Sequence, residues 1–200
     1  MTRPVAAIVL AGGRGRRLGD VDKPDLAGRD GRTMLDGVLK AVADALVVVV
    51  GPPRDLPPGS ISVREDPPGG GPAAAIAAGC AALGERYDAA SSELVDALVA
   101  VLAADLPYVT ALTVHRLCAA LDGHPDAGGA VLIDPAGRRQ RLVGVWRWDA
   151  LLAAVQRRDG WHDASVQDLL AQIPVIAAPA LGNEATDIDT PDDLARWLGE

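Results

Sequence analysis

The residues best suited to chemistry lie near the N-terminus, in the stretch LAGGRGRRLGDVDKPDL at positions 10–26. Glycines let backbone N–H groups approach and wrap a phosphate, and arginines add charge-assisted hydrogen bonds to it. Arg14, Arg16 and Arg17 stand out because the whole chain carries a formal charge of −8. Together these features predict a phosphate-binding loop with Lys23 behind it. The alternative is a tight turn whose arginines are merely solvated.

Two common phosphate loops do not fit this stretch. A Walker A loop needs Gly-Lys-Ser/Thr leading into a helix, but Lys23 follows Asp22 and precedes Pro24. A dinucleotide fingerprint needs Gly-x-Gly-x-x-Gly, but counting from Gly13 places Leu18 where the third glycine should be. The missing glycine also argues against a Rossmann oxidoreductase.

Several aspartates could bind a metal or a polar substrate. Asp105 follows the apolar run ALVAVLA, and a carboxylate at the end of a buried strand is a common way to hold Mg²⁺. Asp187 and Asp189 alternate in TDIDTP, so both lie on one face if that segment is extended. Asp66 lies in a Gly/Pro-rich loop, where a turn-forming role is the default. Helix capping or a surface turn is the alternative role for the other three.

The elements that position these residues alternate between strands and helices. Val5–Leu10 and Leu46–Val50 are short apolar runs bounded by glycine, typical of parallel strands buried on both faces. Further strands are expected at 61–63, 97–103, 130–133, 142–146 and 174–177, and helices at 34–45, 111–121, 149–156 and 165–170, with an Ala-rich helix starting near Pro72 and a last helix capped by Thr190. This order predicts an α/β fold with a mainly parallel sheet. In such folds ligands bind beyond the carboxyl ends of the strands.

Composition excludes several classes of protein. A length of 200 residues and the lack of a linker favour one domain over 1–200. The acidic balance disfavours a nucleic-acid partner. With no apolar run of membrane length and no signal peptide, we expect no membrane partner and a cytoplasmic location. The two cysteines form no CxxC pair and the three histidines are scattered, which argues against a disulfide or a zinc site.

The first motif, LAGGRGRRLGDVDK, resembles the signature loop of the MobA-type molybdenum cofactor guanylyltransferases, a group within the sugar-phosphate-type nucleotidyltransferases. The resemblance continues in EDPPGGGPAAAIAAG, LAADLPYVT and DIDTPDDLARW, so that four ordered motifs cover essentially the whole chain. It implies a three-layer α/β/α sandwich of the nucleotide-diphospho-sugar transferase type, with a mainly parallel, Rossmann-like central sheet.

The resemblance also implies roles for individual residues. The backbone of Leu10, Ala11 and Gly12 would meet the guanine and ribose. The triphosphate would be held by Gly13, Arg14, Gly15 and Arg17. Lys23 would neutralise charge developing on the phosphates, and Arg17, Lys23 and Asp105 are the implied catalytic residues. Asp66 and Gly71 would contact the nucleoside side of GTP.

The metal and the acceptor follow from the same resemblance. Asp105 and Asp189 would hold Mg²⁺, and Asp187 and Asp189 would lie near the pterin substrate. These two aspartates replace asparagines of the family pattern. Their added negative charge favours either a second Mg²⁺ or a different acceptor. Gly51 stands where relatives often carry a base-reading asparagine, so guanine specificity is implied by the family alone.

The implied reaction is Mg²⁺-dependent transfer of GMP from GTP to molybdopterin with release of pyrophosphate. Its partners would be GTP and the molybdenum cofactor, with transient contact to molybdoenzymes or their chaperones. Three alternatives stay open: the same chemistry with CTP, as in a molybdopterin cytidylyltransferase; another phosphorylated acceptor, as in a phospholactate guanylyltransferase; and a non-catalytic nucleotide-binding homologue.

Overall fold

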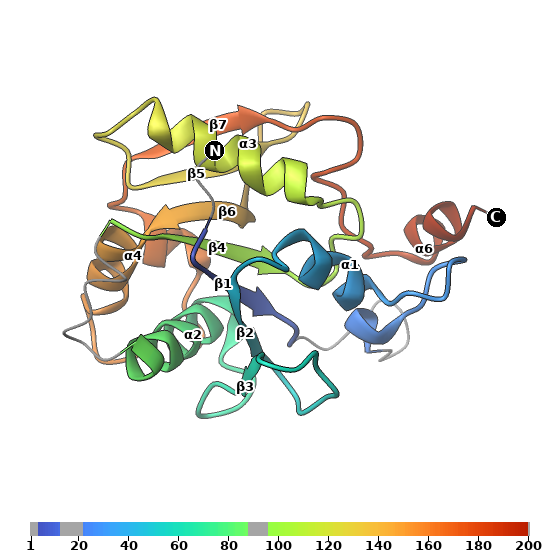
Figure 1. Ribbon diagram of the computed structural model, residues 1–200, viewed down its shortest axis with the longest axis horizontal. Coiled ribbons are helices and arrows are strands. Elements are labelled where there is room, and N and C mark those ends of the chain that lie inside the picture. The colour runs from blue at the N-terminus through green and yellow to red at the C-terminus, as the bar shows by residue number, and fades with distance from the viewer. Residues whose placement is uncertain (1–3, 13–21, 88–95, 200) are drawn as a thin grey trace.

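A seven-stranded sheet forms the centre of the computed structural model, which describes residues 4–12, 22–87 and 96–199 (Figure 1). The strand order is β3-β2-β1-β4-β6-β5-β7. The strands are β1 (Ala6–Leu10), β2 (Leu46–Val50), β3 (Ile61–Val63), β4 (Leu98–Ala103), β5 (Gly129–Ile133), β6 (Arg139–Arg147) and β7 (Val175–Pro179). Only β6 runs antiparallel to its neighbours in this described sheet. The predicted mainly parallel sheet is confirmed.

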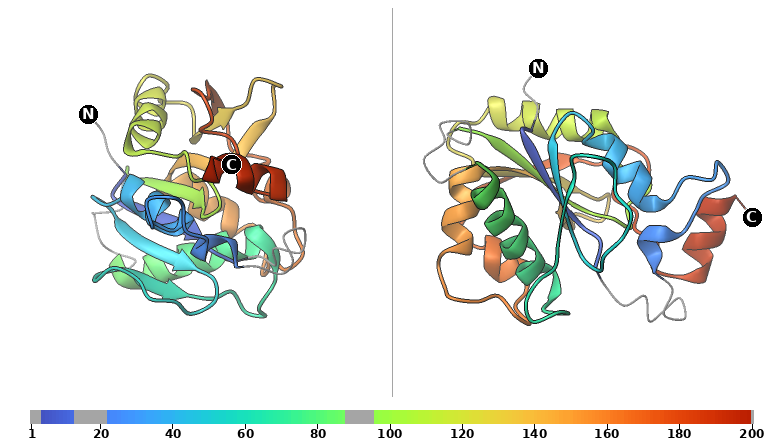
Figure 2. Two further views of the ribbon diagram at one scale, coloured as in Figure 1. Left: turned by 90° about the vertical axis from the view of Figure 1, so that its right-hand side faces the viewer. Right: turned by 60° about the horizontal axis from the view of Figure 1, so that its bottom comes forward.

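Helices cover both faces of the sheet, which gives the predicted three layers (Figure 2). The described helices are the short 3-10 helix η2 (Lys23–Asp25), α1 (Met34–Ala41), α2 (Gly71–Tyr87), α3 (Ala111–Asp122), α4 (Trp148–Val155), α5 (Val166–Leu170) and α6 (Pro191–Leu198). Helices α1 and α3 pack on one face, against the side of β1 that carries Ala7 and Val9. Helices α2, α4 and α5 pack on the other face, against Ile8 and Trp146. None of the described helices has the length and apolar character needed to cross a bilayer.

The apolar character of the strands explains their place at the centre. All five residues of β1 are buried, and four of the five in β2 are buried. A strand that is apolar at every position can pack against helices on both faces of a parallel sheet. Helix α2 approaches β1 closely through Gly79, where an added Cβ would lie 2.5 Å from Cγ2 of Ile8.

Local capping sets several helix ends. Thr33, Thr110 and Thr190 each accept a hydrogen bond from the backbone N–H three residues on, and so begin α1, α3 and α6. The predicted cap at Thr190, with Pro191 in the first turn, is confirmed. Figures 1 and 2 show α6 beside the chain that follows η2, where a Cβ on Gly28 would lie 3.0 Å from the Trp197 ring.

Most predicted boundaries lie within two residues of the observed ones, but two differ by more. The helix predicted over 34–45 ends at Ala41, because residues 42–45 turn the chain back into β2, with the N–H of Ala45 bonded to the carbonyl of Val42. The strand predicted over 142–146 begins at Arg139, inside the expected polar turn. That turn is shorter because the Asp134 carboxylate accepts hydrogen bonds from both the backbone N–H and the side chain of Arg138.

Both cysteines belong to the core. Cys80 and Cys118 are buried and free. Burial raises the pKa of each thiol to about 12, so neither is ionised at neutral pH.

Candidate nucleotide site

The carboxyl ends of three parallel strands meet at one level of the sheet. Leu10 at the end of β1 lies opposite both Val50 of β2 and Ala103 of β4. The pairing continues one residue further, because the N–H of Ala11 donates to the carbonyl of Val50 at 2.8 Å. The backbone of Ala11 and Gly12 therefore lies at the edge where ligands bind in open α/β sheets.

Gly51 packs tightly against this backbone. A Cβ at position 51 would lie 2.7 Å from both the carbonyl carbon and the carbonyl oxygen of Ala11, and 2.9 Å from the nitrogen of Gly12. Real Cβ atoms do not approach a backbone so closely, so a side chain at this position would displace one of the two segments. Here glycine is required by the close approach of the chain that follows β2 to the end of β1.

Lys23 joins two of the predicted aspartates. Its ammonium, on η2, donates a hydrogen bond to the Oδ1 atom of Asp189 and lies 3.8 Å from the Oδ2 atom of Asp105. The Lys23 side chain is only 13% exposed, so water screens these ion pairs less than it would on an open surface. Asp105 follows β4 and Asp189 precedes α6. The fold therefore gathers three predicted site residues from segments far apart in the sequence.

The segment carrying Asp187 and Asp189 is anchored between them. Ile188 is buried at 1% exposure, and its N–H donates to the carbonyl of Asp105 at 3.3 Å. This bond brings the segment alongside the end of β4, with one aspartate on each side of the anchor. Asp189 is half-buried and Asp187 is exposed.

Burial has the largest effect on the ionisation of Asp105. Burial raises the pKa of Asp105 above its usual value, the Lys23 ammonium lowers it, and the negative charges of Asp187 and Asp189 raise it again. The net direction is upward. A cation bound beside Asp105 would therefore favour its ionised form.

The cluster provides two carboxylates that converge on one cation. Within the ranges 4–12, 22–87 and 96–199, no group of three or more metal-binding side chains lies close enough to hold an ion alone. Mg²⁺ is usually bound by one or two protein carboxylates, with water and substrate phosphates completing its shell. Asp105 and Asp189 therefore fit Mg²⁺ bound together with a nucleotide.

Other predicted site residues lie apart or outside the described structure. Asp66 is exposed in the loop after β3, and Gly71 begins α2. The predicted phosphate residues Gly13, Arg14, Gly15 and Arg17 lie outside the described residues.

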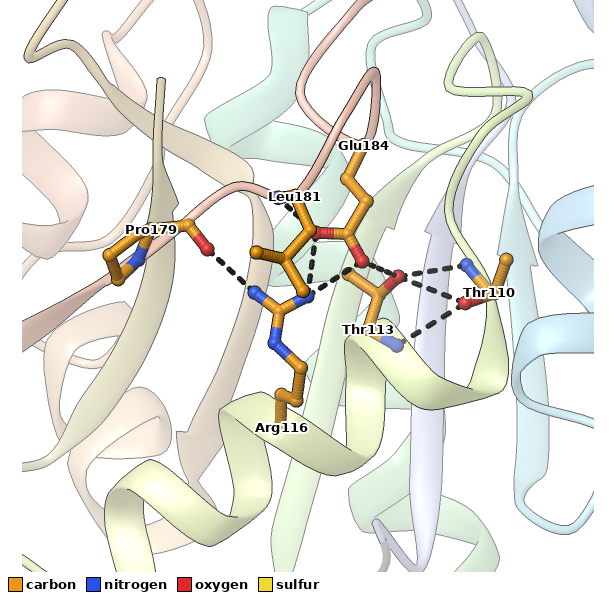
Figure 3. Close-up of polar contacts among 6 residues, drawn as sticks. All are labelled: Thr110, Thr113, Arg116, Pro179, Leu181 and Glu184. Atoms are coloured by element: carbon orange, nitrogen blue, oxygen red, sulfur yellow. Dashed lines mark hydrogen bonds and ion pairs between the residues drawn. The ribbon is translucent and has the colours of Figure 1, made fainter. Parts of the chain in front are cut away.

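A network of polar contacts around Glu184, which the motifs did not reveal, lies just before the Asp187–Asp189 segment in the chain (Figure 3). Arg116 of α3 donates to both carboxylate oxygens of Glu184, at 2.8 and 2.7 Å, and to the carbonyl of Pro179. Thr113 donates to the same carboxylate at 2.6 Å, and so does the N–H of Leu181 at 2.8 Å. The sequence offered no clear signal, because Glu184 stands among small and polar residues in ALGNEAT.

The charge of Glu184 is favoured by these bonds. Burial acts to raise the pKa of its carboxyl group, but the hydrogen bonds from Arg116, Thr113 and Leu181 together bring it below the ordinary value. Because Glu184 is held as an anion, it fixes the turn that precedes Asp187. The network acts on the site through the backbone.

A second residue missed by the motif search is Arg54, in the loop after β2. Its side chain is only 6% exposed. The guanidinium donates to the carbonyl of Ala11 at 3.0 Å and to a carboxylate oxygen of Asp25 at 2.6 Å. A single arginine among prolines gives no recognisable sequence signal, since its partners lie 29 and 43 residues away.

A separate cavity lies on the α5 side of the sheet. Its volume is about 200 Å³, and the described residues that line it include none of those predicted from the motifs. The lining residues are Val131, Arg139, Arg141, Trp146, Gln167, Leu170, Ala171, Ile173 and Val175.

Comparison with known proteins gives a consistent set of relatives. The family model of the MobA-like NTP transferase domain matches residues 7–176. The molybdenum cofactor guanylyltransferase of Rhodobacter capsulatus is 32% identical, over 96% of this chain and 94% of its own length. The bifunctional protein GlmU of Gluconacetobacter diazotrophicus is 33% identical over 98% of this chain. The chain spans only 40% of that protein.

Solved structures share the fold at lower identity. Molybdopterin-guanine dinucleotide biosynthesis protein A of Archaeoglobus fulgidus superposes with a TM-score of 0.71 at 19% identity, covering 97% of each chain. A manganese complex of Rv0371C from Mycobacterium tuberculosis superposes with a TM-score of 0.66 at 21% identity, covering 100% of each chain. At these identities the likeness establishes the architecture of the sheet and helices.

Proposed function

We propose that this chain, which belongs to the MobA-like NTP transferase family, transfers GMP from GTP to molybdopterin and releases pyrophosphate. The enzyme class, nucleotidyltransferase, follows from the family. The finer assignment is supported by the guanylyltransferase relative, which matches along nearly its whole length. The structural observation that carries the proposal is the convergence of Lys23, Asp105 and Asp189 beside the end of β1.

In this proposal the end of β1 receives the nucleoside. The backbone groups of Leu10, Ala11 and Gly12 would face the guanine and ribose. The triphosphate would extend toward Lys23, with Gly13, Arg14, Gly15 and Arg17 as its further ligands. Two phosphates must approach each other in the reaction, and cationic side chains reduce the repulsion between them.

The bonding changes are those of an in-line displacement. An oxygen of the acceptor phosphate forms a bond to the α-phosphorus of GTP, and the bond from that phosphorus to the oxygen bridging to the β-phosphate breaks. Pyrophosphate leaves with the bonding electrons. No covalent intermediate on the protein is needed, because the chain's task is to align two anions and stabilise the transition state electrostatically.

Asp105 and Asp189 would hold Mg²⁺ in the loaded enzyme. Their carboxylates converge on one cation, and burial is the main reason that the pKa of Asp105 is raised, so a bound cation would favour its ionised form. Bound Mg²⁺ would supply Lewis-acid stabilisation of the phosphate oxygens. Asp187, exposed on the other side of Ile188, would face the acceptor together with Asp189.

Isothermal titration with GTP, CTP and ATP, each with Mg²⁺, tests the nucleotide. We expect GTP to bind at least tenfold more tightly than the others, a difference of about 1.4 kcal/mol. Turnover is then measured as pyrophosphate release with molybdopterin present or absent. Tighter binding of CTP would contradict guanylyl transfer and favour the cytidylyl reaction. GTP binding without release of pyrophosphate would indicate another acceptor or a non-catalytic homologue.

A further inference from the structure

Arg54 connects the chain on both sides of the glycine- and arginine-rich motif, taken here as residues 12–19. Its Nη2 atom donates to the carbonyl of Ala11 at 3.0 Å, just ahead of that motif. Behind the motif, Nη1 donates to Asp25 at 2.6 Å and Nη2 donates to Asp22 at 3.3 Å. Asp22 and Asp25 flank Lys23 closely in sequence. One guanidinium therefore joins the end of β1 to η2, the helix that carries the site lysine.

The geometry suits arginine in particular. A planar guanidinium presents several N–H donors in a fixed fork, so it can bond a carbonyl and two carboxylates at once. A lysine ammonium is a single point of charge on a flexible stem and cannot span the same three acceptors. The spacing of these three acceptors therefore favours arginine over lysine at position 54.

Burial of this guanidinium is not favourable by itself. Arg54 is only 6% exposed, whereas its partners Asp22 and Asp25 are 46% and 57% exposed. Among the described residues its Nε atom is buried and has no hydrogen-bond partner. A buried charge with an unpaired donor contributes little net stability. The arrangement is better explained by what it holds in place.

We propose that Arg54 is a positioning residue for the nucleotide site. It holds the Lys23 ammonium at a fixed place relative to the Ala11 carbonyl, so that the lysine meets Asp105 and Asp189 at the end of β4. The proposal rests on the proposed function for its catalytic consequence. The tie, meaning the link that Arg54 makes between the end of β1 and η2, can be tested without any substrate.

The chain has only two lysines, Lys23 and Lys40, which makes the tie measurable. Lys40 is exposed on α1 and serves as an internal reference. Trace labelling with acetic anhydride, followed by mass spectrometry, gives the reactivity of Lys23 relative to Lys40. We expect Arg54→Met to raise this ratio by about fivefold or more, because loss of a buried ion pair frees the local segment.

Arg147 provides a matched control. Its side chain, like that of Arg54, joins separate segments of the chain, here by donating to the backbone carbonyls of Ala127 and Leu121 at the opposite end of the sheet. Arg147→Met should leave the labelling ratio unchanged. An unchanged ratio in Arg54→Met, or an equal rise in Arg147→Met, would overturn the positioning role. If Arg54→Met loses its thermal unfolding transition, Asp25→Asn replaces it, since it removes one partner from the exposed side, and we expect it to raise the ratio too.

Kinetics then test whether the tie acts through Lys23. In pyrophosphate release, Arg54→Met should lower kcat about tenfold or more and change KM for GTP less. Arg54→Lys should recover only part of the loss. In a Lys23→Ala background, Arg54→Met should lower kcat little further, because the two residues act as one unit. Additive losses would refute the coupling. If the wild-type protein binds no nucleotide, the proposed function fails. The labelling ratio still tests whether Arg54 holds Lys23 in place.

Discussion

The backbone N–H of Ile188 donates to the carbonyl oxygen of Asp105 at 3.3 Å, which fastens the segment before α6 to the end of β4. Because Ile188 is buried, the residues on either side of it turn toward the site edge. This single bond explains how Asp189, near the C-terminus, comes to share Lys23 with Asp105. It also makes the site depend on contacts that lie outside it.

Lys23 should contribute to the chemical step. Lys23→Ala removes the ammonium that faces Asp105 and Asp189, and we expect kcat to fall about 100-fold, since preorganised charge is worth this much in comparable sites. Pyrophosphate release measured at saturating GTP checks it. Lys40→Ala is the control and should retain full activity, since Lys40 lies exposed on α1. Equal losses in the two variants would contradict the assignment.

At neutral pH the ionised Asp105 carboxylate should lower the stability of the folded protein, although activity requires it. Its pKa is raised in the folded protein by burial, so the folded state favours the protonated form. The native state therefore gains stability as the pH falls through this raised pKa, and loses it as the pH rises. We expect Asp105→Asn to unfold at a higher temperature than wild type at pH 7 and to be inactive.

The stability difference for Asp105→Asn should shrink as the pH approaches about 4, the ordinary range of an aspartate, because the wild-type group is then protonated as well. Thermal unfolding at pH 4, 5.5 and 7 measures this trend. An Asp105→Asn variant less stable than wild type at pH 7 would show that the attraction of Lys23 outweighs burial.

Glu184 should have the opposite effect on stability. Burial opposes its ionisation, but its hydrogen bonds from Arg116 and Thr113 bring its pKa below the ordinary value, so it stabilises the fold above that value. Glu184→Gln should cost about 1–3 kcal/mol at pH 7. The loss should narrow as the pH falls through the lowered pKa.

Denaturant unfolding of Glu184→Gln measures that loss, and Glu85→Gln on the exposed side of α2 is the matched control, expected to be neutral. We also expect Glu184→Gln to weaken acceptor turnover, since the turn before Asp187 loses its anchor. Unaltered stability of Glu184→Gln would mean that the network is not important for that turn.

Gly51→Ala should disturb the nucleoside end of the site. The added Cβ would lie 2.7 Å from the Ala11 carbonyl carbon, so the end of β1 or the loop after β2 must shift. We expect GTP affinity to fall about tenfold, as for other small displacements of positioned backbone. Gly84→Ala on α2, where nothing lies within 4 Å, should bind GTP normally and be slightly more stable. Titration calorimetry of the two variants decides the matter.

Much of the architecture could be predicted from the sequence. Strands such as AAIVL and LVVVV are apolar at every position, and a parallel strand covered on both faces requires just that. Thr190 and Pro191 marked the start of α6 because capping depends on atoms within one turn. Since parallel strands end at a common edge, the residues that follow β1 and β4 could be assigned to one site.

The partners within that site were decided by the tertiary structure. Lys23 and Asp189 are 166 residues apart, and no local pattern distinguishes Asp189 from Asp66 as the partner of the lysine. Arg54 and Glu184 carried no motif, because their roles depend on groups that only the packed chain brings within hydrogen-bond distance. Propensity and capping act over a few residues and are written in the sequence, whereas a contact between distant side chains depends on the lengths and packing of everything between them.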